Sequence, residues 1–219
     1  MSAATATAVT GSALPHPYRV ASRRVDTADT VTVELAPDAT PLPAFAPGQF
    51  AMLTAFGIGE VPISLSGLPK AGDGSARRLT HTLRAVGAVT RALHATTPGA
   101  VIGVRGPFGT SWDVPSAAGH DVVVVAGGIG LAPVRPILQA VLAEPSRYGE
   151  IVLLVGARTP ADLLYRDELR RWAAAGVRWA SRWIGRPTAG PATSAWFPLW
   201  SRPPGSTRAT RWRSSVVPR

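Results

Sequence analysis

A short stretch between a run of valines and a helical pattern has the residue types of a phosphate-binding turn. Residues 121–138 read DVVVVAGGIGLAPVRPIL, in which four valines lead into Gly127-Gly128-Ile129-Gly130. Glycines let a diphosphate approach the main chain, and the free N–H groups at the start of the following helix attract its negative charge. A dinucleotide is therefore the ligand that these residues predict.

The usual fingerprint of such a turn is incomplete here. Pro133 stands where a third glycine is usual, and no acidic residue ends the next strand, where Gly156-Ala157-Arg158 is found. Pro133 does suit the first turn of a helix, because its absent N–H costs little there. From these residues alone, a glycine-rich turn without a ligand stays open as the alternative.

The surrounding residues, 117–176, alternate as a parallel sheet requires. Asp121–Ala126 and Ile151–Val155 are nearly continuous apolar runs, which are typical of strands buried on both faces. A helix is expected between them, because apolar residues recur at helical spacing at Val134, Ile137, Leu138 and Val141. A second helix is expected at about 161–175. Strand, helix, strand and helix predict an α/β unit with right-handed crossovers.

Residues 17–116 predict a different architecture, an antiparallel barrel or sandwich. Strands are expected as two runs within 18–35, and over 49–54, 63–66, 78–86 and 101–105, with a hairpin loop at 70–75 and a short helix over 89–95. Short strands joined by glycine- and proline-rich turns are typical of such all-β units. The boundary is expected near 115–119, and residues 1–16 are expected to form a disordered leader.

The net charge of +10 is concentrated in the last 43 residues. Residues 177–219 contain eight arginines, five tryptophans and six prolines but no acid, which leaves only +2 for the first 176 residues. A genuine Arg/Trp tail could bind single-stranded nucleic acid, whereas the nearly balanced body gives no reason to expect nucleic acid as a partner.

The tail also lacks a strand or helix period, and a single lysine against 22 arginines is consistent with a GC-rich gene. We therefore hypothesise that the native reading frame ends near Val177. Reading the other frames of the gene tests this idea, which fails if no cysteine-bearing continuation is found there.

Several classes of site are excluded by composition. The chain has no cysteine, so it can form no disulfide, thiolate zinc site or self-ligated iron–sulfur cluster. The four histidines are scattered without ligand spacing, and no metal site is predicted. The apolar runs are far shorter than the ~20 residues of a membrane helix. Without a secretory signal at the start, a cytoplasmic location without membrane insertion is expected.

Four segments in order resemble the ferredoxin–NADP reductase-like flavoprotein superfamily. They are FAPGQFAMLTAFGIGEVPISLSG, LRAVGAVTRALHATTPGAVIGVRGPFGTSW, VVVVAGGIGLAP and VLLVGARTPADLLYRDELRRW. The resemblance covers roughly residues 17–176. It is greatest to the gamma subunits of group 3 nickel–iron hydrogenases, with the related subunit of anaerobic sulfite reductase and the dihydroorotate dehydrogenase electron-transfer subunit as cousins. It implies a six-stranded FAD barrel followed by a pyridine-nucleotide domain.

The resemblance also implies where FAD binds. The family's Arg-x-Tyr-Ser segment falls on residues 61–64, so Val61 stands where the arginine is usual and only the serine is kept. Ser64 is expected near the reactive nitrogen of the flavin. The family's Gly-x-Val-Thr segment is intact. The residues implied to contact FAD are Pro62, Ile63, Ser64, Leu65, Gly87, Ala88, Val89 and Thr90.

For NAD(P)H, the resemblance implies a diphosphate contact by Gly127, Gly128, Ile129, Gly130, Leu131, Ala132 and Pro133, and an adenosine contact by Gly156, Ala157 and Arg158. The choice between NADH and NADPH stays open. Asp162 is a possible capping residue of the following helix. Tyr165 either packs in the core or touches the nucleotide.

The implied function is electron transfer between NAD(P)H, FAD and an iron–sulfur or metal centre in a partner subunit of a hydrogenase- or reductase-type complex. The family's later strands and its cysteine cluster for [2Fe–2S] are not found in this chain. A non-catalytic flavin-binding remnant is therefore the alternative.

Overall fold

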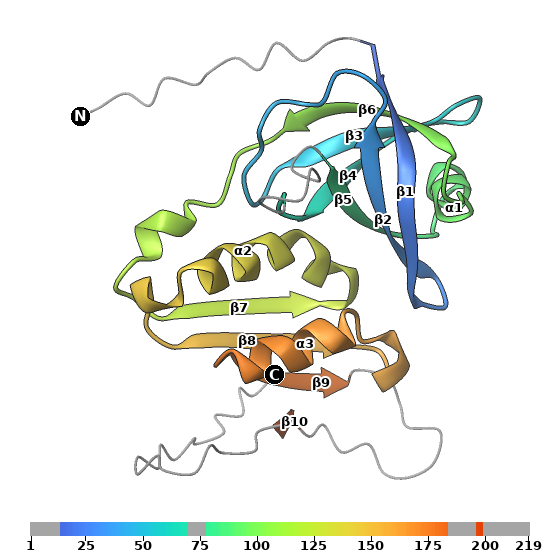
Figure 1. The fold of residues 1–219 in the computed structure, drawn as a ribbon. Helices are drawn as coiled ribbons and strands as arrows, with labels where there is room; N and C mark the ends of the chain where they lie inside the picture. Colours follow the sequence, from blue (N-terminus) through green and yellow to red (C-terminus); the bar gives the residue numbers. More distant parts are fainter. Residues whose placement is uncertain (1–13, 70–77, 184–195, 199–219) are drawn as a thin grey trace, which may run out of the picture.

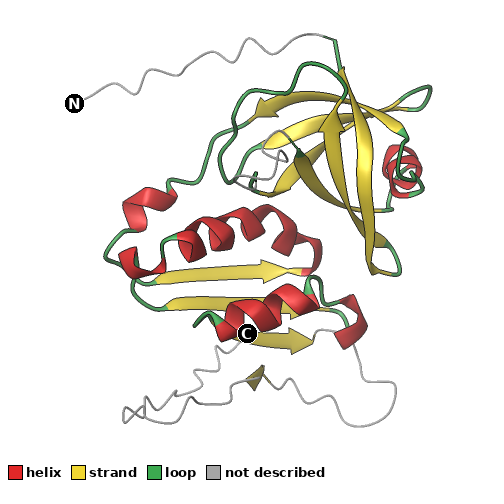
Figure 2. Cartoon of the chain, in the orientation of Figure 1, coloured by secondary structure: helices red, strands yellow, loops and turns green. Residues whose placement is uncertain are grey.

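The computed structural model describes residues 14–69, 78–183 and 196–198. Within them, a closed six-stranded antiparallel barrel is followed by a sheet with helices (Figure 1). Figure 2 shows strands predominating in the first unit, and helices alongside strands in the second. The predicted two-part fold is confirmed, and of the barrel and sandwich alternatives the barrel is correct.

The barrel closes because its first and last strands pair. Its strands follow the order β1-β2-β5-β4-β3-β6. They are β1 (His16–Thr27), β2 (Thr30–Pro37), β3 (Phe50–Ala55), β4 (Gly59–Gly67), β5 (Leu79–Arg84) and β6 (Val101–Phe108), with helix α1 (Ala88–His94) between β5 and β6. The strand β4 is longer than predicted, and His16 belongs to β1. The leader residues 1–13 and the hairpin loop predicted at 70–75 lie outside the described residues.

The second unit contains three parallel strands, β7 (Val122–Gly127), β8 (Ile151–Ala157) and β9 (Arg178–Trp183). A short strand, β10 (Trp196–Pro198), pairs antiparallel with β9. The helices are α2 (Leu131–Ala143) and α3 (Arg166–Ala174). Four 3₁₀ turns connect these elements: η2 (Val114–Ala117), η3 (Gly128–Gly130), η4 (Pro145–Arg147) and η5 (Pro160–Asp162).

The prediction that β7 is buried on both faces is wrong. Val124 and Ala126 are buried, but Val123 and Val125 are 61% and 68% exposed. The strands β7, β8 and β9 follow one another across the sheet, so right-handed crossovers place α2 and α3 on the same face. Leu138 of α2 and Leu169 of α3 accordingly belong to one core cluster. Among the described residues, no second helical layer covers Val123 and Val125.

The boundary predicted at residue 176 is too early. Strand β9 continues the parallel sheet from Arg178, directly after the buried Val177. Trp179 and Trp183 pack against the core of this unit, although both were assigned to the tail. The arginine- and tryptophan-rich composition masked the strand because only alternate residues of β9 face the core. Most of the remaining tail lies outside the described residues.

Helix α3 begins later than predicted. The expected helix at 161–175 is interrupted, because Pro160–Asp162 forms the turn η5 and Tyr165 adopts a left-handed conformation with φ of 54°. Regular helix starts only at Arg166. Asp162 does act in capping, since its carboxylate accepts from the amide and hydroxyl of Thr159 at 3.1 and 2.9 Å. It caps η5 and not α3.

Helix α2 connects the two units. Figure 1 shows α2 between the barrel and the sheet. Its Gln139 side-chain oxygen accepts a hydrogen bond of 2.8 Å from the amide of Leu68, just after β4. No helix in the described part of the chain is long and apolar enough to cross a membrane.

We expect the one-sided burial of the sheet to be visible in the free energy of unfolding. Leu153 is fully buried in β8, so Leu153→Ala should remove about 2–5 kcal/mol by leaving a cavity. Val125→Ala on the exposed face of β7 should change it by less than about 0.5 kcal/mol. Urea unfolding of both variants measures the difference, and equal losses would contradict the one-sided burial.

A second prediction concerns His81, which is fully buried in the barrel core. Its Nδ1 lies 3.1 Å from the carbonyl oxygen of Ser64, and its Nε2 has no hydrogen-bond partner in the described structure. Burial lowers the pKa of His81 to about 4. Between about pH 6.5 and 4 the unfolded chain therefore binds a proton that the folded chain does not. Stability should fall by roughly 3 kcal/mol as the pH drops through this range.

His81→Leu should abolish this part of the pH dependence, because leucine fills the apolar site without titrating. Urea unfolding at pH 7.5 and pH 4.5 provides the measurement. His120→Gln, at an exposed position, is the matched control and should keep the wild-type slope. An unaltered slope in His81→Leu would show that His81 is not the responsible group.

Candidate functional site

The predicted diphosphate turn is open beside its main chain. Gly127 ends β7, Gly128 has a left-handed φ of 53°, and Gly130 directly precedes α2. A Cβ atom placed on Gly127 or Gly130 would meet no atom within 4 Å. The conformation thus favours glycine at position 128, while the other two glycines leave space next to the backbone. This is the space that an approaching diphosphate would need.

Arg84, at the end of β5, reaches this turn from the barrel. Its Nη2 lies 3.8 Å from the Cβ position of Gly128. Its Nε is buried 3.3 Å from Oδ2 of Asp29, without hydrogen-bond geometry. Arg84 was not predicted from the sequence, because one arginine at a strand end forms no local motif. Its place three residues before Gly87 is the only available signal.

The second predicted glycine segment starts α1. Gly87 has ordinary extended dihedral angles, and the nearest atom to its Cβ position is Oγ1 of Thr90 at 3.9 Å. Thr90 is buried, and its hydroxyl accepts from the amides of Val86 and Gly87 at 3.0 and 2.8 Å. Thr90 therefore caps the helix, while Ala88 is exposed and Val89 partly buried. Because Arg84 lies in the strand that leads to Gly87, the two glycine segments flank one arginine.

The predicted flavin segment on β4 has mixed exposure. Pro62 is exposed and Ser64 is partly buried. Ile63 packs against the hydrophobic core of the barrel. The carbonyl oxygen of Ser64 faces His81, which anchors this part of β4 to β5. The structure thus leaves Pro62 and Ser64 as the accessible side chains of the segment.

Besides Thr90, four of the predicted contact residues have buried side chains. Leu65 lies in the core of the barrel, and Leu131 and Ala132 lie in the core of the α/β unit. Ala157 is 2% exposed. These positions offer a ligand only their main chain, because alternate residues of a strand and one face of a helix point inward.

Arg158, after β8, is held by two carboxylates. Its Nη2 lies 2.8 Å from Asp162 and 3.5 Å from Asp29 of the β1–β2 turn, and its side chain is 61% exposed. The hydrogen bond and charge of Asp162 raise the pKa of Arg158. For Asp29, burial raises the pKa, but hydrogen bonds from Thr30 and Thr27 and the two arginines bring it below its usual value. Asp29 thus joins Arg84 and Arg158 across the two units.

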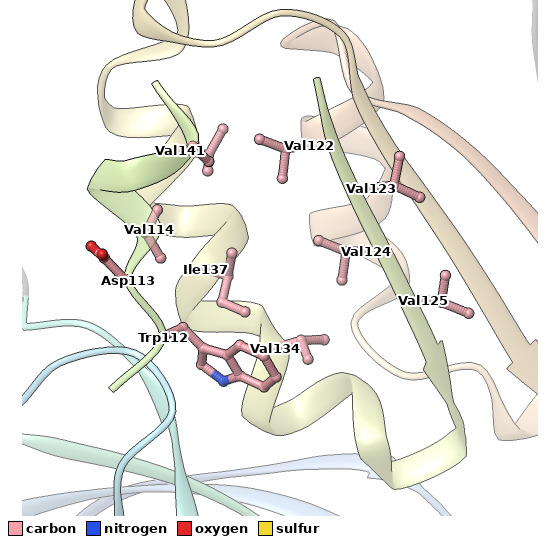
Figure 3. Close-up of a pocket in the computed structure, with 11 residues that line it drawn as sticks. Trp112, Asp113, Val114, Val122, Val123, Val124, Val125, Val134, Ile137 and Val141 are labelled. Carbon is pink, nitrogen blue, oxygen red and sulfur yellow. The ribbon is translucent and has the colours of Figure 1, made fainter. Parts of the chain in front are cut away.

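An apolar groove of about 290 Å³ lies elsewhere, along β7, which has no partner on this edge among the described strands. Figure 3 shows Val122 and Val124 pointing toward α2, with Val123 and Val125 on the opposite side of the strand and Trp112 nearby. The groove carries no cluster of charged groups and does not include the glycine turn. It is therefore separate from the candidate site.

Comparison with known proteins identifies the second unit. Residues 124–184 match the oxidoreductase NAD-binding domain family. The chain is 35% identical over 125 residues to the sulfhydrogenase 2 subunit gamma of Pyrococcus furiosus. It is 37% identical over 128 residues to the probable dihydroorotate dehydrogenase B (NAD(+)) electron transfer subunit of Methanocaldococcus jannaschii. These alignments cover 57% and 58% of the chain but only 41% and 43% of the relatives.

The fold has a similar solved structure. A cytochrome P450 reductase from Amycolatopsis superposes with a TM-score of 0.66 at 28% identity, over 80% of this chain and 52% of that one. The family match includes the glycine turn from Val124 onward and extends through β9, as the sheet does. The chain therefore has the ferredoxin–NADP reductase-like fold, and its second unit matches the oxidoreductase NAD-binding domain family.

Proposed function

We propose that the chain is a flavoprotein electron-transfer subunit, which binds FAD on the barrel and NAD(P)H at the turn of residues 127–133. It would pass electrons to an iron–sulfur or metal centre in a partner subunit of a hydrogenase- or reductase-type complex. One observation carries this proposal. Arg84, three residues before the Gly87 turn, lies 3.8 Å from the Cβ position of Gly128. Two glycine turns from separate units therefore lie close to one arginine, in space for Gly128 and in sequence for Gly87.

The residues of the barrel fit FAD in charge and in space. Val61 supplies no cation where the family has arginine, but Arg84, also on the barrel, brings a guanidinium to the glycine turn. The buried Nε of Arg84 lies 3.3 Å from Oδ2 of Asp29, and its Nη2, which faces Gly128, is the group that would donate to a phosphate oxygen. The Cβ position of Gly87 is open, which leaves the main chain accessible. Ser64 is accessible on β4 for a polar contact with the flavin ring.

The chain's own part in the reaction is positioning. FAD, when bound, supplies the chemistry of accepting a hydride and releasing electrons singly. The turn before α2 would hold the diphosphate of NAD(P)H by main-chain N–H groups, aided by the positive end of the helix. Arg84 would lie close to both diphosphates. No protein acid or base is required, so the site needs correct placement and exclusion of competing partners.

The names of the relatives support the electron-transfer part of the proposal. One relative is a sulfhydrogenase gamma subunit and another an electron transfer subunit. Since the matched segments span about two fifths of these proteins, the partner complex and the cytoplasmic location are part of the proposal. The nucleotide preference stays open. Arg158 is the residue available for a 2′-phosphate, but Asp29 and Asp162 already pair with it.

The alternative, a flavin-binding remnant, has an observation in its favour. The apolar residues Val123 and Val125 are exposed on a strand whose outer edge is unpaired among the described residues. Such a face is a liability in an isolated domain. Bound yellow flavin that NADH and NADPH both fail to reduce would indicate the remnant.

Two glycine substitutions test the proposed sites separately. Gly87→Ala and Gly130→Ala suit the local dihedral angles, so neither should unfold the chain. Each adds a methyl group to open space beside the main chain. Gly87→Ala should weaken FAD binding about tenfold, and Gly130→Ala should weaken NAD(P)H binding about tenfold, each equivalent to about 1.4 kcal/mol. Flavin fluorescence quenching and nucleotide titration provide the two affinities.

Each variant is the control for the other, since both are glycine to alanine at a helix start. The wild-type chain should gain a flavin absorbance spectrum and a higher melting temperature on addition of FAD. A wild-type chain that stays colourless, with an unchanged melting temperature, would refute the proposed function.

A further inference from the structure

Tyr165 connects the α/β unit to the barrel through a buried hydroxyl group. It is 4% exposed and adopts the left-handed conformation that non-glycine residues rarely adopt. This conformation directs the phenol across the unit boundary, where its hydroxyl donates to Oγ1 of Thr82 on β5 at 2.6 Å. Burial raises the pKa of Tyr165 to about 12, so the hydroxyl remains a donor at neutral pH.

The hydrogen bonds beyond Thr82 have a definite direction. Thr82 and Thr32 are 2.7 Å apart through their hydroxyls, and Thr32 donates to the carboxylate of Asp26. Because an ionised carboxylate only accepts, the chain runs from Tyr165 through Thr82 and Thr32 to Asp26. Arg24 pairs with Asp26 at 2.9 Å. Each donor in this buried chain thus has an acceptor.

A second buried connection comes from α2. Arg135 binds Glu168 of α3 with both Nε and Nη2, at 2.6 and 2.9 Å, and its Nη1 donates to the carbonyl oxygen of Ser66 on β4. The guanidinium groups of Arg135 and Arg24 lie 5.0 and 5.6 Å from the centre of the Tyr165 ring. The two helices are therefore bound to each other and to strands β1, β4 and β5.

On β4, β5 and α2, each of these contacts lies close in sequence to a residue of the candidate site. Ser66 is two residues from Ser64 on β4, and Thr82 is two residues from Arg84 on β5. Arg135 follows Gly130 by little more than one helical turn. A shift at any of these contacts therefore moves a residue of the candidate site.

We propose that Tyr165 and Arg135 are positioning residues, which hold the nucleotide turn at a fixed distance from β4 and β5 so that NAD(P)H meets the flavin in a reactive geometry. This inference rests on the proposed function. Hydride transfer needs reacting atoms about 3–3.5 Å apart, so loosening the boundary lowers the rate at a given occupancy. Tyr165 itself then packs between the units and does not touch the nucleotide.

Tyr165→Phe tests this role because it keeps the ring and removes the hydroxyl. In the full chain without cofactors, hydrogen exchange in peptides from β4, β5 and α2 should accelerate at least about threefold. With FAD loaded, flavin reduction by saturating NADH or NADPH in a single turnover should slow about tenfold. The dissociation constants of FAD and nucleotide should change less than about twofold. Arg170→Ala, which breaks an exposed pair with Asp167 on α3, is the control and should change none of these quantities.

Unchanged hydrogen exchange and reduction rate in Tyr165→Phe would overturn the proposal, as would weaker nucleotide binding with an unchanged rate. If Tyr165→Phe does not fold, Thr82→Val removes the acceptor with the same side-chain shape and should give the same slower reduction. A wild-type chain that binds no FAD refutes the proposed function. The exchange experiment still stands in that case, because it uses the chain without cofactors.

Discussion

The packing of α2 against the end of β4 determines how the two units face each other. Arg135 donates to the carbonyl oxygen of Ser66, and Gln139 accepts from the amide of Leu68. Buried main-chain groups that lose water need such partners, so this contact cannot slide by a residue without leaving polar groups unsatisfied. Since the glycine turn directly precedes α2, the same contact decides where that turn opens. The position of the glycine turn relative to the barrel is thus a consequence of how one helix packs.

Much of the fold could be predicted from periodicity, and the error at β7 shows where periodicity stops. Four consecutive valines indicate a strand, but they do not indicate which face of the sheet a helix covers. Coverage depends on the direction in which successive strands are added to the sheet, which is a property of the whole unit. At β9 a strand was present but not predicted, because its arginines and tryptophans gave no clear apolar pattern. Trp179 and Trp183 face the core, while Arg182 remains exposed.

The candidate site was predictable where main-chain geometry demands a residue type. The positive φ of Gly128 favours glycine, and the glycines around it leave open space beside the main chain. Residue type alone therefore predicted the turn. Arg84 and Tyr165 were not predictable in this way. An arginine at a strand end and a tyrosine before a helix have no preferred role, and only the meeting of two units gives them one. The left-handed conformation of Tyr165 has no sequence signal, since residues other than glycine reach it only when tertiary contacts compensate.

The charged groups around Arg84 also belong to neither unit alone. Arg84 comes from β5, Arg158 from the end of β8, and Asp29 lies between them on the β1–β2 turn. Val61 stands where the family has arginine, so the flavin segment itself lacks this cation. In the assembled chain, Arg84 of the barrel brings a guanidinium to the glycine turn, and Asp29 offsets part of its cost of burial. Asp29 pairs with both arginines, so under the proposed function a diphosphate would compete with this carboxylate for Arg84. The loss of one motif residue is therefore weaker grounds against flavin binding than the linear sequence indicates.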